Sequence, residues 1–97
     1  MSDARPHLVF FSTRTSGPAR RMESLLAHIA RKERDRLRVT RVDVDTRPDL
    51  AERFRVETVP TIVLIMDNRT VGRIEGRASA PRIERLLEQH LPEQAAA

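Results

Sequence analysis

His7 to Arg20 read HLVFFSTRTSGPAR, a short apolar run followed by a proline-centred turn and the start of a helical pattern. The apolar run contains valine and phenylalanine and predicts a buried strand over His7–Ser12. Thr13 to Ser16 are small or polar turn residues, with Arg14 among them. Pro18 suits the first turn of a helix, where its missing N–H costs nothing. The stretch therefore predicts a buried strand that turns directly into a helix.

A helix and a second strand are expected next. Apolar residues recur at helical spacing from Met22 to Ile29, which places them on one face of a helix. Leu37–Asp45 reads as a strand. Side chains of a strand alternate between its two faces, so Val39 and Val42, which are three residues apart, would point to opposite faces. This strand is therefore either buried on both faces or irregular.

The second half of the chain completes the pattern. It predicts a short helix over Leu50–Phe54, a strand over Pro60–Met66, a hairpin turn at Asp67–Arg69, a strand over Thr70–Glu75 and a helix from Ala80 to Leu91. The order is β-α-β-α-β-β-α, in which a helical crossover makes the first two strands parallel and a tight turn makes the last two antiparallel. One domain is expected over residues 1–97, with its core at about 7–91 and a flexible tail at 92–97.

Two motifs in this pattern resemble the thioredoxin family. They are the turn Ser16-Gly17-Pro18-Ala19 and the sequence Val59-Pro60-Thr61 before an apolar strand. The family's active site reads Trp-Cys-Gly-Pro-Cys, and its substrate groove carries a cis-proline before a strand. The resemblance implies an α/β protein with the minimal thioredoxin fold, a four-stranded mixed sheet flanked by helices. Full-length members begin with an extra strand and helix, which are expected to be missing because only six residues precede His7.

The residues that carry the family's chemistry are replaced. Ser16 and Ala19 stand where the resemblance places two cysteines, and Thr15 stands where it places tryptophan. In the family the first cysteine is a thiolate that attacks a disulfide, and the second resolves the mixed disulfide. A serine hydroxyl cannot take part in that exchange, and alanine has no nucleophile. No catalytic residue is therefore expected in this chain.

Two further departures bear on the same question. The family's buried aspartate, which accepts a proton from the second cysteine, aligns with Phe10, and the basic partner of that aspartate aligns with Arg41. This set of changes favours a redox-inactive protein. The alternative is a thiol–disulfide oxidoreductase whose cysteines at positions 16 and/or 19 were replaced in this chain. A third reading, in which Ser12, Thr13 or Ser16 hydrogen-bonds a bound thiol such as glutathione, lacks a recognisable glutathione-holding motif.

The resemblance also implies a groove for an extended peptide or protein segment, formed by the turn Thr15–Ala19, the loop Val59-Pro60-Thr61 and Gly76. In the family a cis bond before the proline leaves the preceding residue's backbone N–H and C=O open, so Val59–Pro60 is expected to be cis. Ala19→Glu or Thr61→Arg is expected to block capture and to change stability by no more than about 1 kcal/mol, as surface changes usually do. Pro60 and Gly76 can also be read as ordinary loop residues.

Composition restricts the remaining function classes. The chain has no cysteine, which excludes disulfides, thiolate nucleophiles and cysteine zinc sites. Its formal net charge is +4, but only 3% of residues are aromatic, so nucleic-acid binding by base stacking is not expected. His7, His28 and His90 share no ligand spacing, and Asp43 with Asp45 indicates a capped turn rather than a cation site. No metal, no cofactor and no membrane association are expected, and the expected location is the cytoplasm, with a role in cell redox homeostasis implied by the family.

Overall fold

The computed structural model of the protein describes residues 5–14 and 17–91, and of residues 17–19 it describes the backbone only. The elements in chain order are β1 (His7–Ser12), α1 (Gly17–Lys32), β2 (Arg38–Asp43), α2 (Pro48–Arg53), β3 (Thr61–Met66), β4 (Arg69–Glu75) and α3 (Ala80–His90). This is the order β-α-β-α-β-β-α that the sequence predicts.

The strands form one mixed sheet in the order β2-β1-β3-β4. β1 and β2 are parallel because α1 carries the chain back across the sheet between them. β1 pairs with β3 in antiparallel register, and β3 pairs with β4 in the same way across a tight turn. The predicted four-stranded mixed sheet is therefore confirmed, with β1 inside it and β2 at one edge.

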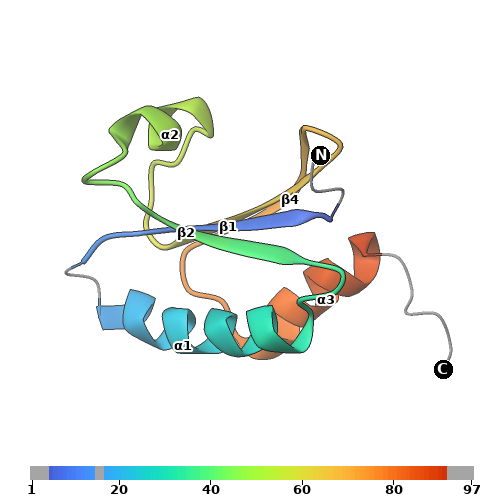
Figure 1. The fold of residues 1–97 in the computed structure, drawn as a ribbon. Helices are drawn as coiled ribbons and strands as arrows, with labels where there is room; N and C mark the ends of the chain where they lie inside the picture. Colours follow the sequence, from blue (N-terminus) through green and yellow to red (C-terminus); the bar gives the residue numbers. More distant parts are fainter. Residues whose placement is uncertain (1–4, 15–16, 92–97) are drawn as a thin grey trace, which may run out of the picture.

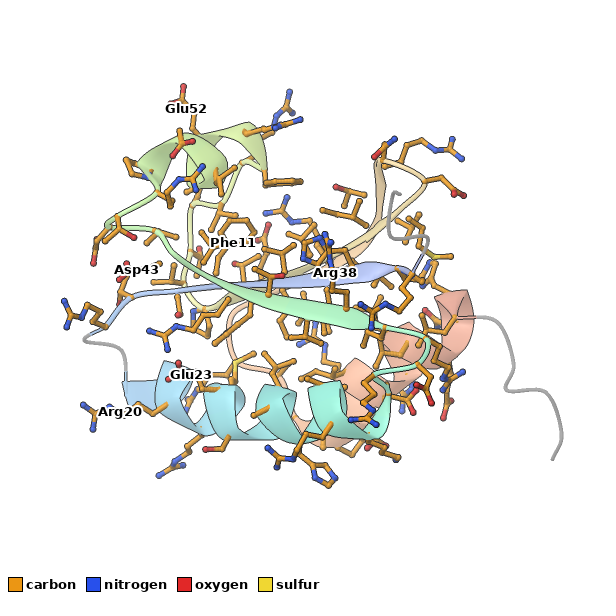
Figure 2. The ribbon with its side chains drawn as sticks, in the orientation of Figure 1. Phe11, Arg20, Glu23, Arg38, Asp43 and Glu52 are labelled. Atoms are coloured by element: carbon orange, nitrogen blue, oxygen red, sulfur yellow. The ribbon has the colours of Figure 1, made fainter. Side chains whose placement is uncertain are left out.

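Helices cover both faces of this sheet, with α1 and α3 on one face and α2 on the other (Figure 1). The larger core lies under α1 and α3 and includes Phe10, and the smaller core lies under α2 and includes Phe11. In Figure 2, Phe11 lies on the α2 side of the sheet and Glu23 on the α1 side. Val39 packs against the larger core, and Val42 belongs to the smaller one. β2 is thus a regular strand with an apolar residue on each face, which explains why Val39 and Val42 point to opposite faces.

Several element boundaries differ from the prediction by one or two residues. Asp67 and Asn68 have φ of 52° and 63°, the pair of positive values that a two-residue type I′ hairpin turn requires. Arg69 therefore belongs to β4, not to the turn. Phe54 lies just beyond α2, and its ring centroid is 5.7 Å from that of Phe11. α2 is therefore held on the sheet partly by an aromatic contact from its C-terminal cap.

Candidate functional site

Two strand ends that border the predicted site lie side by side at one end of the sheet. The register pairs Phe11, near the end of β1, with Thr61, the first residue of β3. The loop after β1 and the loop before β3 therefore leave the sheet side by side. Thr15 and Ser16 lie outside the described residues, as do the side chains of Gly17, Pro18 and Ala19. The backbone of Gly17 already belongs to α1.

The loop before β3 has the predicted backbone geometry. The Val59–Pro60 peptide bond is cis, which confirms the prediction. Pro60 is buried and Val59 is half-buried. Within the described residues neither the N–H nor the C=O of Val59 has a hydrogen-bond partner. Val59 thus offers one backbone donor and one backbone acceptor at the surface of this loop.

Thr61 is buried, whereas the sequence predicted an exposed position that tolerates a large charged side chain. Its side chain is 0% exposed, and its hydroxyl donates a 2.6 Å hydrogen bond to the backbone C=O of Thr58. Thr61→Arg would force a charged side chain into the core, so treating this position as a tolerant surface site was wrong. The sequence placed Thr61 at the start of a strand but could not show that both faces of that strand are covered.

Gly76 lies next to Pro60. Its backbone N–H donates a 2.8 Å hydrogen bond to the C=O of Pro60, and its φ is +83°. That φ favours glycine because a side chain there is strained. A Cβ placed on Gly76 would meet no atom within 4 Å. Gly76 is therefore needed for the turn and leaves open space beside Pro60.

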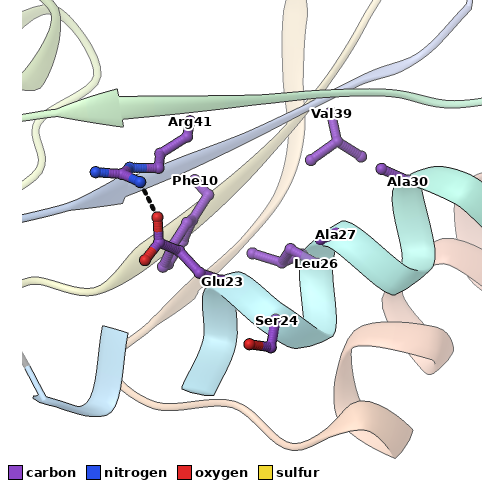
Figure 3. A pocket seen from close by; sticks show the side chains of 8 residues that line it. All are labelled: Phe10, Glu23, Ser24, Leu26, Ala27, Ala30, Val39 and Arg41. Atoms are coloured by element: carbon purple, nitrogen blue, oxygen red, sulfur yellow. Dashed lines mark hydrogen bonds and ion pairs between the residues drawn. The ribbon is translucent and has the colours of Figure 1, made fainter. Parts of the chain in front are cut away.

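Phe10 and Arg41, which align with the family's buried aspartate and its basic partner, lie close together beneath α1. Glu23 lies beside them. Phe10 is 1% exposed. Arg41 forms an ion pair with Glu23 of α1 (Figure 3). Sequence reasoning missed Glu23, because a glutamate on a charged helix gives no signal of its partner on a distant strand. An apolar ring and a helix carboxylate therefore occupy this region.

The same residues border a groove between α1 and β2, which we call the edge groove. Its apolar lining comes from Phe10, Leu26, Ala27, Ala30 and Val39, and its volume is about 450 Å³. Figure 3 shows the Glu23–Arg41 ion pair at one end of the groove and Ala30 facing Val39 toward the other. Both charged side chains are partly exposed, at 33% for Glu23 and 51% for Arg41. The edge groove is therefore an open apolar surface with a charge pair at one end.

Several other polar residues that the sequence singles out have local structural partners. The Asp43 carboxylate accepts the backbone N–H of Asp45 at 2.8 Å, which is the expected capped turn. His7 lies between Arg38 and Thr40, with its ring nitrogens 2.9 and 2.6 Å from their side-chain atoms. Among the described residues, no group of three His, Asp or Glu side chains could hold a metal ion. No helix in that part of the chain is long and apolar enough to cross a membrane.

Comparisons with known proteins agree with this geometry. The family model described as Thioredoxin matches residues 1–89. The chain is 34% identical over 92 residues to a thioredoxin of Mycobacterium tuberculosis, covering 95% of this chain and 79% of that protein. It is equally identical to the bifunctional thioredoxin reductase/thioredoxin of Mycobacterium leprae, of which it spans 20%. The crystal structure of the germline-specific thioredoxin Deadhead from Drosophila melanogaster superposes with a TM-score of 0.84 at 28% identity, covering 91% of this chain and 83% of that one.

Proposed function

This chain belongs to the thioredoxin family, and we propose that it is a redox-inactive member that binds an extended segment of another protein. The proposed surface is formed by the turn Thr15–Ala19, the loop Val59-Pro60-Thr61 and Gly76. The observation that carries the proposal is the pair of open backbone groups on Val59 in a chain without cysteine.

Redox inactivity follows from the chemistry of the available atoms. Thiol–disulfide exchange needs a thiolate to attack a disulfide sulfur, and this chain contains no thiol. The hydroxyl of Ser16 is far less acidic than a thiol and cannot form a mixed disulfide. The buried ring of Phe10, at the position where the resemblance places an aspartate, offers no group that could accept a proton. We therefore assign this surface to binding and not to electron transfer.

Backbone pairing is the proposed mode of binding. An extended segment that runs past Val59 can accept its N–H and donate to its C=O, as in the pairing of two strands. The open space beside Gly76 gives the segment room to approach Pro60. Main-chain bonds of this kind supply affinity without strict sequence preference, so side chains of the turn would supply selectivity. We expect the interaction to take place in the cytoplasm.

Peptide selection on the full chain tests the proposal. A random dodecapeptide phage library is panned against the immobilised protein, and enriched peptides are synthesised and titrated. Ala19→Glu places a charge in the turn of the proposed surface, whereas Ala27→Glu places the same charge on α1 in the edge groove. We expect peptides that bind the proposed surface to bind Ala19→Glu at least ten-fold more weakly than the wild type and to bind Ala27→Glu with unchanged affinity. The proposal fails if no peptide is enriched or if Ala19→Glu binds every peptide as the wild type does.

A further inference from the structure

The chain reverses its direction at Arg55, directly after α2. Arg55 has a φ of 53°, in the left-handed region that residues other than glycine seldom adopt. Its N–H donates to the C=O of Glu52 at 3.0 Å, and the N–H of Val56 donates to the C=O of Ala51 at 2.8 Å. This pair of hydrogen bonds is the Schellman motif that ends many helices, and Arg55 occupies the position at which glycine is usual. The end of α2 is therefore built on a residue that does not favour the required backbone conformation.

A side chain of β4 holds this reversal in place. The guanidinium of Arg73 donates from one terminal nitrogen to the C=O of Phe54 at 2.9 Å, and from the other to the C=O of Arg55 at 3.1 Å. These carbonyls belong to the two peptide planes on either side of the Cα of Arg55, so fixing both planes fixes the φ and ψ of that residue. A guanidinium suits this task because its donors form a rigid planar fork. Arg73 thus stabilises, from the sheet, a backbone conformation that the residue type at position 55 does not favour by itself.

The guanidinium of Arg73 is oriented by these two carbonyl groups. Arg73 pairs with Val63 of β3, whose side chain belongs to the smaller core, so Arg73 lies on the α2 side of the sheet. One terminal nitrogen also forms an ion pair with Glu75 at 3.2 Å. The Nε atom is buried and has no acceptor among the described residues. The orientation of the guanidinium therefore satisfies the two loop carbonyls and not all of its own donors.

The residue directly after β4 holds the other end of the same loop, which runs over residues 55–60 from α2 to β3 (Figure 1). At that end the N–H of Gly76 donates to the C=O of Pro60 at 2.8 Å. Arg73 and Gly76 therefore fix the loop at its first and last residues. The open N–H and C=O of Val59 lie between these two points. The direction in which Val59 presents them depends on both restraints.

We propose that Arg73 is a positioning residue for the binding surface around Pro60. By fixing the backbone of Arg55, it holds the loop in the conformation that presents the donor and acceptor of Val59 to an extended segment. This role rests on the proposed function and adds to it a residue that does not touch the bound segment. A loop that is already ordered loses little conformational entropy when it binds, so the restraint increases affinity.

The order of the loop in the free chain tests this proposal without any ligand. Arg73→Met removes every guanidinium donor and keeps an unbranched side chain. We expect the amide NMR order parameters of residues 57–59 to fall from about 0.85, the value of a rigid backbone, to below about 0.6. Arg69→Met makes the same change at an exposed position of β4 and should leave these values unchanged. Thermal unfolding verifies that both variants are folded at the temperature of the measurement. A loop that stays rigid in Arg73→Met would overturn the proposal.

A second substitution tests whether Arg73 acts through Arg55. Glycine adopts a positive φ readily, so Arg55→Gly makes the reversal less dependent on Arg73. The side chain of Arg55 is exposed, and the double variant Arg55→Gly/Arg73→Met should regain at least half of the lost order. Glu75→Gln removes the ion pair but keeps both carbonyl bonds, and it should leave the loop as rigid as in the wild type. A double variant that remains mobile, or a mobile loop in Glu75→Gln, would contradict the assigned role.

Affinity for the peptides selected on the wild-type chain tests the connection to binding. Arg73→Met should bind them at least ten-fold more weakly, and the double variant should recover most of that loss. A role in overall stability alone would not change the affinity of a chain that is fully folded during the titration.

The two readouts fail separately. If no peptide is enriched, the proposed function fails and the binding role of Arg73 fails with it, while the order parameters still decide whether Arg73 fixes the loop. If Arg73→Met binds the peptides as tightly as the wild type does, the proposed function stands and the positioning role of Arg73 is overturned.

Discussion

Arg41 on β2 forms an ion pair with Glu23 on α1 beside the buried ring of Phe10. The resemblance to thioredoxins implies a buried aspartate at position 10 that pairs with a basic residue at position 41. In this chain the carboxylate comes from the helix instead, at a partly exposed position. The charge partner of Arg41 is therefore a partly exposed helix residue, and the buried position beneath α1 is held by the apolar ring of Phe10.

Phe10 should matter far more for stability than the ion pair beside it. Phe10→Ala removes a buried ring and leaves a cavity, which costs about 3–5 kcal/mol. Glu23→Ala breaks a partly exposed pair and should cost no more than about 1 kcal/mol. Urea unfolding of both variants, followed by circular dichroism, measures the two values. Comparable losses would show that the ion pair is a principal element of the core.

The wild-type chain should not catalyse disulfide reduction, because it has no sulfur nucleophile. In an insulin-reduction assay with dithiothreitol, its rate should equal the uncatalysed background. Ser16→Cys/Ala19→Cys supplies the dithiol and should raise the rate above background, although Phe10 leaves the second cysteine without a proton acceptor. An acceleration by repurified wild-type protein would contradict redox inactivity.

The hydroxyl of Thr61 should contribute measurably to stability. Thr61→Val keeps the shape of the side chain but removes the hydrogen bond that the hydroxyl donates to the C=O of Thr58, which costs about 0.5–1.5 kcal/mol. Thr61→Arg should prevent stable folding, because it buries an unpaired charge. Thermal unfolding of both variants tests this, with Thr70→Val on the exposed part of β4 as the control. Normal stability of Thr61→Arg would mean that β3 can open at its first residue.

The carboxyl group of Asp49 should titrate below its ordinary range. Its pKa is lowered chiefly by the side-chain hydrogen bonds that Arg47 donates, at 3.2 and 3.1 Å. A depressed folded-state pKa gives a contribution to stability that is present above the unfolded pKa and is lost as pH falls through the folded value. An NMR titration of the carboxyl carbon should show the midpoint rising in Arg47→Gln and staying in place in Arg53→Gln. An unchanged midpoint in Arg47→Gln would mean that the pair does not persist in solution.

The order of elements could be predicted from sequence because apolar periodicity is a local pattern. The cis bond was predicted from the resemblance of Val59-Pro60-Thr61 to the family's groove loop, since an X-Pro sequence alone does not specify the cis form. The start of β4 was predicted one residue too late. It depends on the positive φ of Asn68 in the hairpin turn, which asparagine allows but does not require.

Features that depend on contacts between distant elements could not be predicted. Glu23 finds Arg41 only when α1 lies over β2, eighteen residues further along the chain. The burial of Thr61 depends on β1 and β4 pairing on either side of β3. The edge groove likewise exists because Ala27 and Ala30 are small where β2 has no further neighbour among the described residues.

The pairing of β1 with β3 has a consequence for synthesis on the ribosome. β3 and β4 meet across a two-residue turn, whereas His7 of β1 pairs with Ile65 after more than half the chain has been added. Until β3 emerges, Val9 and Phe11 lie on a strand with one side unpaired. Exposed apolar strands of this kind aggregate readily. The nascent chain should therefore be most vulnerable, and most dependent on chaperones, while its first sixty residues are outside the tunnel.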